Sequence, residues 1–213
     1  MEYINIPLIV TVSGGIVIAI LSFIAVRNES ERKWIPLLTF ITALVIIING
    51  LFAGIEQVKT ERDLLYSITG GDSYCYLDFG FSGNKTNILA FVVHKGKFPL
   101  YDVYIDLADL TMFNDLKSYT EQDYLETRIR HKIDDLSPGK TYQLPLIKLK
   151  ENWNKQDYNI FIHARNGRWI QQERLRIINN KFVHAKRVLK GDKELISDIS
   201  KDYPLNDRGE VDW

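Results

Sequence analysis

"AVRNESERKWIP", residues 25 to 36, is a short charged segment between two apolar stretches. The stretches, residues 6–26 and 35–55, are each 21 residues long and have no charged side chain. An α-helix of that length is roughly 30 Å long, about the thickness of the hydrocarbon core of a bilayer. A soluble core helix is usually shorter and has a polar face. The pattern therefore predicts two transmembrane helices joined by a hairpin loop, residues 27–34.

A cleaved signal peptide is the alternative interpretation of the first stretch, and its sequence argues against it. The preceding residues, "MEYIN", are acidic rather than basic. The stretch is longer than an ordinary signal-peptide core, and no small-x-small site precedes Arg27. We therefore expect two uncleaved spans.

Basic residues near the two spans bear on orientation, because Lys and Arg favour the cytoplasmic side of a membrane. The hairpin carries three of them, whereas Lys59 and Arg62 follow the second span. This balance favours a cytoplasmic hairpin in a multi-pass protein of the bacterial inner membrane. The side that holds the rest of the chain stays open, with the balance favouring the outside.

Small residues in the apolar stretches predict close helix packing, on which association in lipid depends. Asn49 is the one strongly polar side chain in either stretch. We expect it to hydrogen-bond between helices, since intramembrane transport sites ordinarily contain ionisable groups. The predicted contact residues are Gly15, Ala19, Asn49, Gly50 and Gly54.

A helical stalk is predicted beyond the second span, over residues 56–72. Long side chains recur there at spacings of three and four, at Ile55, Val58, Arg62 and Leu65. Gly70 and Gly71 are expected to end the helix. A simple spacer and a coiled coil between subunits are both consistent with this pattern.

From residue 73 the apolar period changes to two, which is typical of β-strands. About eight short strands are predicted, at residues 74–81, 88–95, 100–107, 125–133, 142–149, 158–165, 168–177 and 181–189. Asn166-Gly167 between two of them is a strong hairpin signal. The pattern predicts an all-β antiparallel sandwich or small barrel over residues 73–190. The segment 108–124 is longer than a hairpin loop and is expected to contain a short helix or to cover one end of the sheet.

Two segments of this region carry a resemblance. "LSPGKTYQLPL", residues 136–146, and "YNIFIHARNGRW", residues 158–169, resemble the later half of a fibronectin type III or immunoglobulin-like domain. The chain as a whole is similar to uncharacterised bacterial membrane-anchored proteins. The resemblance implies a fold and no activity.

The final residues, 191–213, form a polar acidic tail in which residues 192–199 are expected to make two helical turns. The remainder of the tail is expected to be flexible, with Tyr203, Leu205 and Trp213 as its anchors. Three basic and seven acidic residues give this tail a net charge of −4.

Charge is unevenly distributed, although the whole chain has a net charge of zero. Residues 150–190 contain ten Lys or Arg and three Asp or Glu, a net of +7, whereas residues 100–135 have a net of −5. Mutual neutralisation within one domain is one interpretation. The other is an anion-binding face with an aromatic stacking surface, suited to a phosphorylated ligand or lipid headgroup. Its predicted residues are Arg165, Arg168, Trp169, Arg174, Arg176, Lys186 and Arg187.

The candidate chemistry in this sequence is sparse. Cys75 is the only cysteine and alternates with apolar residues, so we expect it to be buried and inert. No histidine pair has metal-ligand spacing, and no nucleotide-binding or hydrolase motif is present. We expect no catalytic residue, no metal, no cofactor and no nucleic-acid partner.

Two functions remain. The first is a membrane-anchored binding or scaffolding protein that presents a β-domain to a protein partner, or to further copies of the chain through the helices. The second is a ligand-gated membrane effector whose β-domain senses a charged small molecule such as a nucleotide. A hydrolase with an unrecognised site is a third and weaker possibility.

Overall fold

The structure, a computed structural model, describes residues 15–18, 20, 35–81, 86–116, 120–149 and 153–213. The chain divides into two compact units, Met1–Leu64 and Leu65–Trp213. Of the predicted first span, only residues 15–18 and 20 are described, and they are helical.

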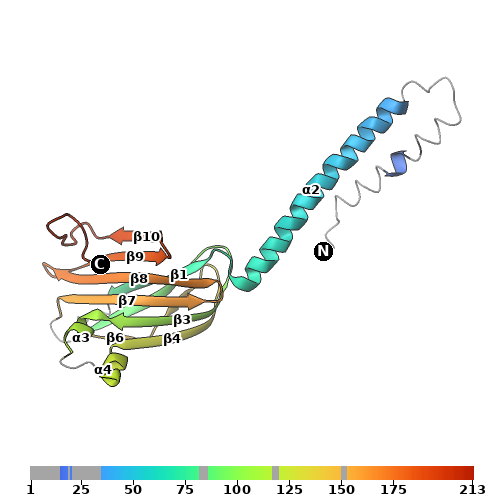
Figure 1. The fold of residues 1–213 in the computed structure, drawn as a ribbon. Coiled ribbons are helices and arrows are strands. Elements are labelled where there is room, and N and C mark those ends of the chain that lie inside the picture. Colours follow the sequence, from blue (N-terminus) through green and yellow to red (C-terminus); the bar gives the residue numbers. More distant parts are fainter. Residues whose placement is uncertain (1–14, 19, 21–34, 82–85, 117–119, 150–152) are drawn as a thin grey trace. The chain divides into compact units, whose positions relative to one another are not determined.

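The long helix α2, Ile35–Thr69, is the main described element before the β-strands (Figure 1). Its segment Thr39–Thr69 is long and apolar enough to cross a membrane. The helix continues beyond Ile55 and ends where Gly70 and Gly71 take φ values of +97° and +54°. Glycine favours this left-handed region because it has no Cβ, so the pair forms a natural helix stop.

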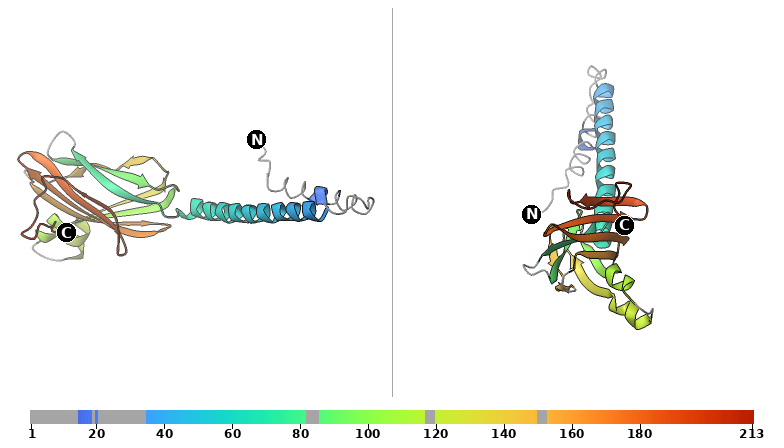
Figure 2. Two further views of the ribbon diagram at one scale, coloured as in Figure 1. Left: turned by 90° about the horizontal axis from the view of Figure 1, so that it is seen from above. Right: turned by 90° about the vertical axis from the view of Figure 1, so that its left-hand side faces the viewer.

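The described residues of the second unit form ten strands in two antiparallel sheets (Figures 1 and 2). The strands are β1 (Tyr74–Phe81), β2 (Asn87–Lys95), β3 (Leu100–Asp109), β4 (Arg128–Leu136), β5 (Thr141–Gln143), β6 (Ile147–Lys148), β7 (Lys155–Ala164), β8 (Gly167–Ile178), β9 (Lys181–Lys190) and β10 (Lys193–Ile199). The larger sheet has the order β10-β9-β8-β7-β3-β4. In the smaller sheet the order is β1-β2-β5, and β6 also pairs with β2. Every strand pair in the described residues is antiparallel, which confirms the predicted antiparallel β-fold. Neither sheet closes on itself among the described strands, so the barrel alternative is wrong.

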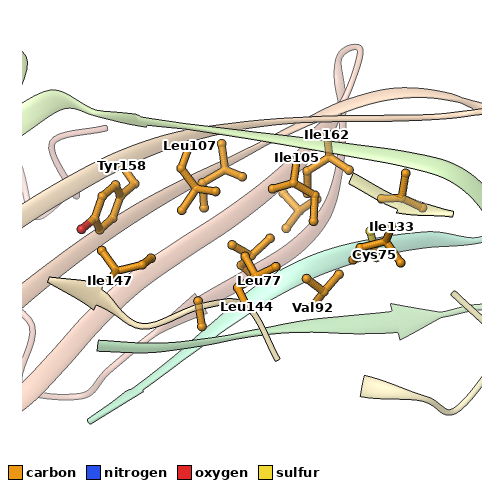
Figure 3. Close-up of a cluster of buried hydrophobic side chains, with 14 of the residues drawn as sticks. Cys75, Leu77, Val92, Ile105, Leu107, Ile133, Leu144, Ile147, Tyr158 and Ile162 are labelled. Carbon is orange, nitrogen blue, oxygen red and sulfur yellow. The ribbon is translucent and has the colours of Figure 1, made fainter. Parts of the chain in front are cut away.

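The two sheets share one hydrophobic core. Figure 3 shows Leu77 and Val92 of the smaller sheet pointing toward Ile105 and Ile162 of the larger one. All four side chains are fully buried. Period-two alternation creates this arrangement, because every second side chain of a strand points to the same face.

Two tight hairpins fix the register of the central strands. The predicted hairpin at Asn166-Gly167 is confirmed, since β7 and β8 pair from Ala164 opposite Gly167. Between β8 and β9, Asn179 and Asn180 have φ values of 50° and 59°. A type I′ turn requires positive φ at both central residues, and Asn tolerates it better than most residues.

Several predicted elements differ in the structure. Residues 121–126 form helix α4 (Glu121–Glu126), so the strand predicted to begin at Leu125 begins at Arg128. The short helix expected within residues 108–124 is confirmed by α3 (Leu110–Asn114), which begins where the Asp109 carboxylate accepts a hydrogen bond from the Met112 amide. Pro145 has no N–H to donate, and the single strand predicted across it is instead the separate β5 and β6.

The predicted helix at residues 192–199 is wrong, because this segment is strand β10. It pairs with β9 from Lys193 opposite Lys190 to Ile199 opposite Ala185. The edge of β9 supplies hydrogen-bond partners that an isolated two-turn helix lacks, and so tertiary pairing overrides local helix propensity.

Candidate functional site

The predicted basic residues lie on or beside the β7–β8 hairpin, β8 and β9, and they are divided between the two faces of the larger sheet. The inner face is the one that packs on the smaller sheet, and the outer face is the opposite one. Trp169 and Lys186 lie on the inner face and are 2% and 4% exposed. Arg168, Arg174 and Arg176 alternate with Trp169 along β8 and so lie on the outer face.

The inner face of β8 closes the free edge of β1. The Trp169 indole Nε1 donates to the Cys75 carbonyl at 2.6 Å. Gln171 mimics a strand backbone, because its Oε1 accepts from the Leu77 amide and its Nε2 donates to the Leu77 carbonyl, both at 2.7 Å. An unpaired strand edge is a template for aggregation, and these side chains occupy part of this one.

A buried ionisable cluster continues from this edge. Gln171 Nε2 also donates to the Glu173 carboxylate at 2.7 Å, and Lys186 Nζ donates to Asp78 Oδ1 at 2.9 Å. Burial raises the pKa of Glu173 to about 8, although the nearby Lys186 cation opposes this shift. The carboxyl group is therefore largely protonated at neutral pH, which avoids an uncompensated buried charge.

The C-terminal segment, residues 200–213, packs on part of the outer face. Tyr203 and Val211 are buried with Val183 and Ala185 of β9 in a second small hydrophobic cluster. Trp213 lies against this cluster. Tyr203 and Trp213 therefore act as two of the predicted anchors, whereas the third, Leu205, is exposed.

Three predicted anion-binding residues make contacts within this region. Arg174 is buried and donates to the backbone carbonyls of Tyr158 and Asp212. The Arg187 guanidinium lies 4.4 Å from the centre of the Trp213 ring. Arg176 pairs with Asp157 and lies over the Tyr203 ring. These guanidinium groups are therefore engaged by the protein itself.

The remaining two basic candidates lie near the β7–β8 hairpin. Arg165 pairs with Asp102 at 2.8 Å and donates to the carbonyl of Ile68, in the last turn of α2. The structure therefore does not bring the seven predicted residues together on one exposed surface. Trp169 was predicted as a stacking surface, and this role is wrong because its ring is in the core.

Another set of side chains on the outer face of the larger sheet is solvent-accessible, and Arg168 is the one member of it that the sequence analysis singled out. We name it the outer-face patch, and it consists of Tyr104, Phe161, His163, Arg168 and Ile170. In the strand register Tyr104 pairs with His163, which pairs with Arg168, and Phe161 pairs with Ile170. Directly paired residues in antiparallel strands have Cβ atoms about 5 Å apart, so the five side chains are contiguous.

The outer-face patch has an aromatic centre and a basic border. Tyr104 is 49% exposed, and Ile170, His163 and Arg168 are also exposed. On the neighbouring strand β4, Arg130 and Lys132 lie beside the patch with side chains about half exposed, and they pair with Asp106 and Asp134. The available signal was the alternation of Tyr104 with the buried Val103 and Ile105.

The predicted helix-packing residues are placed as follows. Ala19 lies outside the described residues. Asn49 Nδ2 donates to the Val45 carbonyl of its own helix at 3.0 Å. A Cβ added at Gly15, Gly50 or Gly54 would meet no atom within 4 Å, so the described part of the chain makes no close contact there.

Cys75 is fully buried in the core, and burial raises the pKa of its thiol, so it is a poor nucleophile. Among the residues that the structure describes, no three His, Cys, Asp or Glu side chains are grouped to hold a metal ion. Comparison with models of known protein families, with curated proteins and with solved structures found no match.

Proposed function

We propose that this protein is a membrane-anchored binding module, not an enzyme. Its second unit, Leu65–Trp213, which we call the β-unit, contacts a protein partner through the outer-face patch. The single observation that carries the proposal is the exposure of an apolar and aromatic surface on the outer face of the larger sheet, another part of which is covered by the C-terminal segment. Exposed apolar patches bordered by polar side chains mark interaction sites more often than scattered apolar residues do.

The composition of the outer-face patch indicates the kind of partner. Tyr and Arg are enriched among residues that dominate binding energy, and a β-sheet holds them rigidly. The aromatic Tyr104 supplies the apolar contact, and Arg168, Arg130 and Lys132 border it. Arg130 and Lys132 already pair with Asp106 and Asp134, so a partner surface with an apolar centre and an acidic group facing Arg168 fits this arrangement.

The anchor in this proposal is a two-helix hairpin in the bacterial inner membrane, with residues 6–26 and α2 as its spans. The length and apolar composition of α2 support one span. The absence of charged residues from residues 6–26 supports the other. An immunoglobulin-like or fibronectin type III-like sandwich is the finer fold that we propose for the β-unit, on the resemblance of residues 136–146 and 158–169.

The ligand-gated effector is less well supported by the geometry. An effector of this kind needs unpaired cationic side chains that can bind an anionic ligand. Five of the six predicted basic residues instead contact carboxylates, carbonyls, an amide oxygen or aromatic rings within the β-unit. These five residues are Arg165, Arg174, Arg176, Lys186 and Arg187. A thermal shift of the full-length protein with cyclic nucleotides would favour the effector over the binding module.

Site-specific photo-crosslinking in cells tests the binding module. A benzophenone amino acid replaces Tyr104 in the full-length chain, and the same replacement at Tyr142 is the matched control. Tyr142 lies on β5 of the smaller sheet and is exposed to a similar degree. We expect a discrete crosslinked product from position 104 that is weakened by Arg168→Glu. Equal products from both positions, or none from position 104, would contradict the proposal.

A further inference from the structure

We propose that α2 pairs in parallel with α2 of a second copy of this chain, through one stripe of its surface. The members of this α2 stripe are separated by four and three residues in strict alternation. They are Leu44, Ile48, Leu51, Ile55, Val58, Arg62 and Leu65. This is the heptad spacing of a left-handed coiled coil. The d positions are Leu44, Leu51, Val58 and Leu65, and the a positions are Ile48, Ile55 and Arg62. The stripe is about 30 Å long at the ordinary helical rise.

The described part of the chain does not cover this stripe. Val58 is 67% exposed and Leu65 is 58% exposed. Both follow Glu56, the first charged residue after the apolar stretch, where a bilayer's hydrocarbon no longer surrounds the helix. Lipid therefore accounts for the exposed side chains before Glu56 and not for those after it.

Beyond Ile55, most residues on the side of the helix away from the stripe are polar, although Leu64 also lies there and is 60% exposed. Glu56, Thr60 and Asp63 are grouped there at spacings of four and three residues. An amphipathic helix of this kind buries its apolar side against another element. The apolar side continues in register from the membrane stretch into the stalk, and a partner with the same repeat over the same length matches it throughout.

The flanking charges select a second copy in parallel orientation. Lys59 flanks the stripe at an e position, and Glu61 flanks it on the other side at a g position. In a parallel pair, the e side of one helix faces the g side of the other, so the basic flank meets the acidic one. An antiparallel pair places like flanks together, which is unfavourable.

Arg62 is the one charged member of the stripe, at an a position. In a parallel pair it lies beside Glu61 of the second copy, which compensates its charge. A single polar residue at an a position fixes register and pairing at some cost in stability. Arg62 therefore aligns the two copies residue by residue.

This inference does not rest on the outer-face patch. Failure of the photo-crosslinking at position 104 leaves the α2 pair intact, and loss of the α2 pair leaves the binding surface intact. The two proposals are therefore separable by experiment.

Disulfide crosslinking of the full-length chain in native membranes tests the pair. Single variants Leu51→Cys, Val58→Cys and Leu65→Cys place a thiol at three successive d positions, and Thr60→Cys is the control on the opposite side. The wild-type chain is a further control, because its Cys75 is buried. After mild oxidation, we expect all three d-position variants to give about fivefold more covalent dimer than Thr60→Cys.

The outcomes separate the possible arrangements. Crosslinking at all three d positions requires a parallel pair in register, because an antiparallel pair brings identical residues together at one level only. Crosslinking at only one of them, at none of them, or equally at position 60 overturns the proposal. We also expect Arg62→Leu to increase dimer from the Val58→Cys chain and Arg62→Glu to reduce it, and an identical response to both changes would contradict the role of Arg62.

Discussion

Apolar side chains are buried in the β-unit and exposed in the helix α2. In the β-unit, side chains such as Leu77, Ile105 and Ile162 are fully buried against one another. In α2, side chains of the same kind, such as Leu51 and Val58, remain mostly exposed. The β-unit therefore contains its own source of stability, whereas α2 depends on lipid and, in our proposal, on a second copy. This difference predicts which substitutions change folding stability and which change only association.

The largest expected effect is that of Trp169→Ala in the core of the β-unit. The substitution removes a large buried side chain and the hydrogen bond to the Cys75 carbonyl, which leaves the β1 edge partly unpaired. We expect a loss of about 3–5 kcal/mol in the free energy of unfolding. Denaturant unfolding of the full-length protein in detergent measures it, with Arg168→Ala as the neighbouring exposed control, expected to change the free energy by less than about 0.5 kcal/mol.

Glu173→Gln should change the pH dependence of stability. The pKa of Glu173 is about 8 in the folded protein, so the folded state holds a proton that the unfolded state has released above its ordinary pKa of 4.5. Wild-type stability therefore has a component that is complete below about pH 4.5 and is lost as pH rises toward 8. The glutamine variant lacks this component.

Relative to wild type, Glu173→Gln should become more stable as pH rises from 5 toward 8, because wild type alone loses the component that the Glu173 proton supplies. Thermal unfolding of both proteins across this range measures the difference. Parallel curves for the two proteins would show that Glu173 titrates in the folded state as it does in the unfolded state.

A smaller effect is expected from Tyr203→Ala in the C-terminal segment. Tyr203 is buried against Val183 and Ala185, and Arg176 lies over its ring. We expect a loss of about 2 kcal/mol. Leu205→Ala, at an exposed position two residues away, is the matched control. Equal, negligible effects of both changes would mean that the segment does not contribute to folding stability.

Most strands were predictable from sequence because apolar and polar residues alternate along them in step with buried and exposed positions. β1 and β3 illustrate this, since their alternating apolar residues form the core. Helix α4 and strand β10 were not predictable in this way, because short segments contain too few residues to distinguish a helical period from a strand period. Strand β10 in addition depends on the β9 edge, which lies outside the local window.

The basic residues were predicted as one face because sequence shows their charge and not their partners. Asp78, Asp157 and Asp102 pair with Lys186, Arg176 and Arg165 from distant points of the sequence. The outer-face patch was missed for the converse reason. Its members come from three strands, and only the register of β3, β7 and β8 brings them together.

The smallest expected effect on folding is that of substitutions in the α2 stripe, and it tests the comparison between the two regions most directly. Val58→Ala removes apolar surface that is already exposed within one chain. If the β-unit is stabilised by its own core, the unfolding free energy of the full-length protein at low concentration in detergent should change by less than about 0.5 kcal/mol. The same substitution should weaken dimer formation at high concentration, because a stripe side chain contributes only when it is paired. Analytical ultracentrifugation beside the unfolding measurement separates the two quantities. A large loss of unfolding free energy without any change in association would mean that α2 contributes to the core of its own chain, and the contrast between the two regions would not hold.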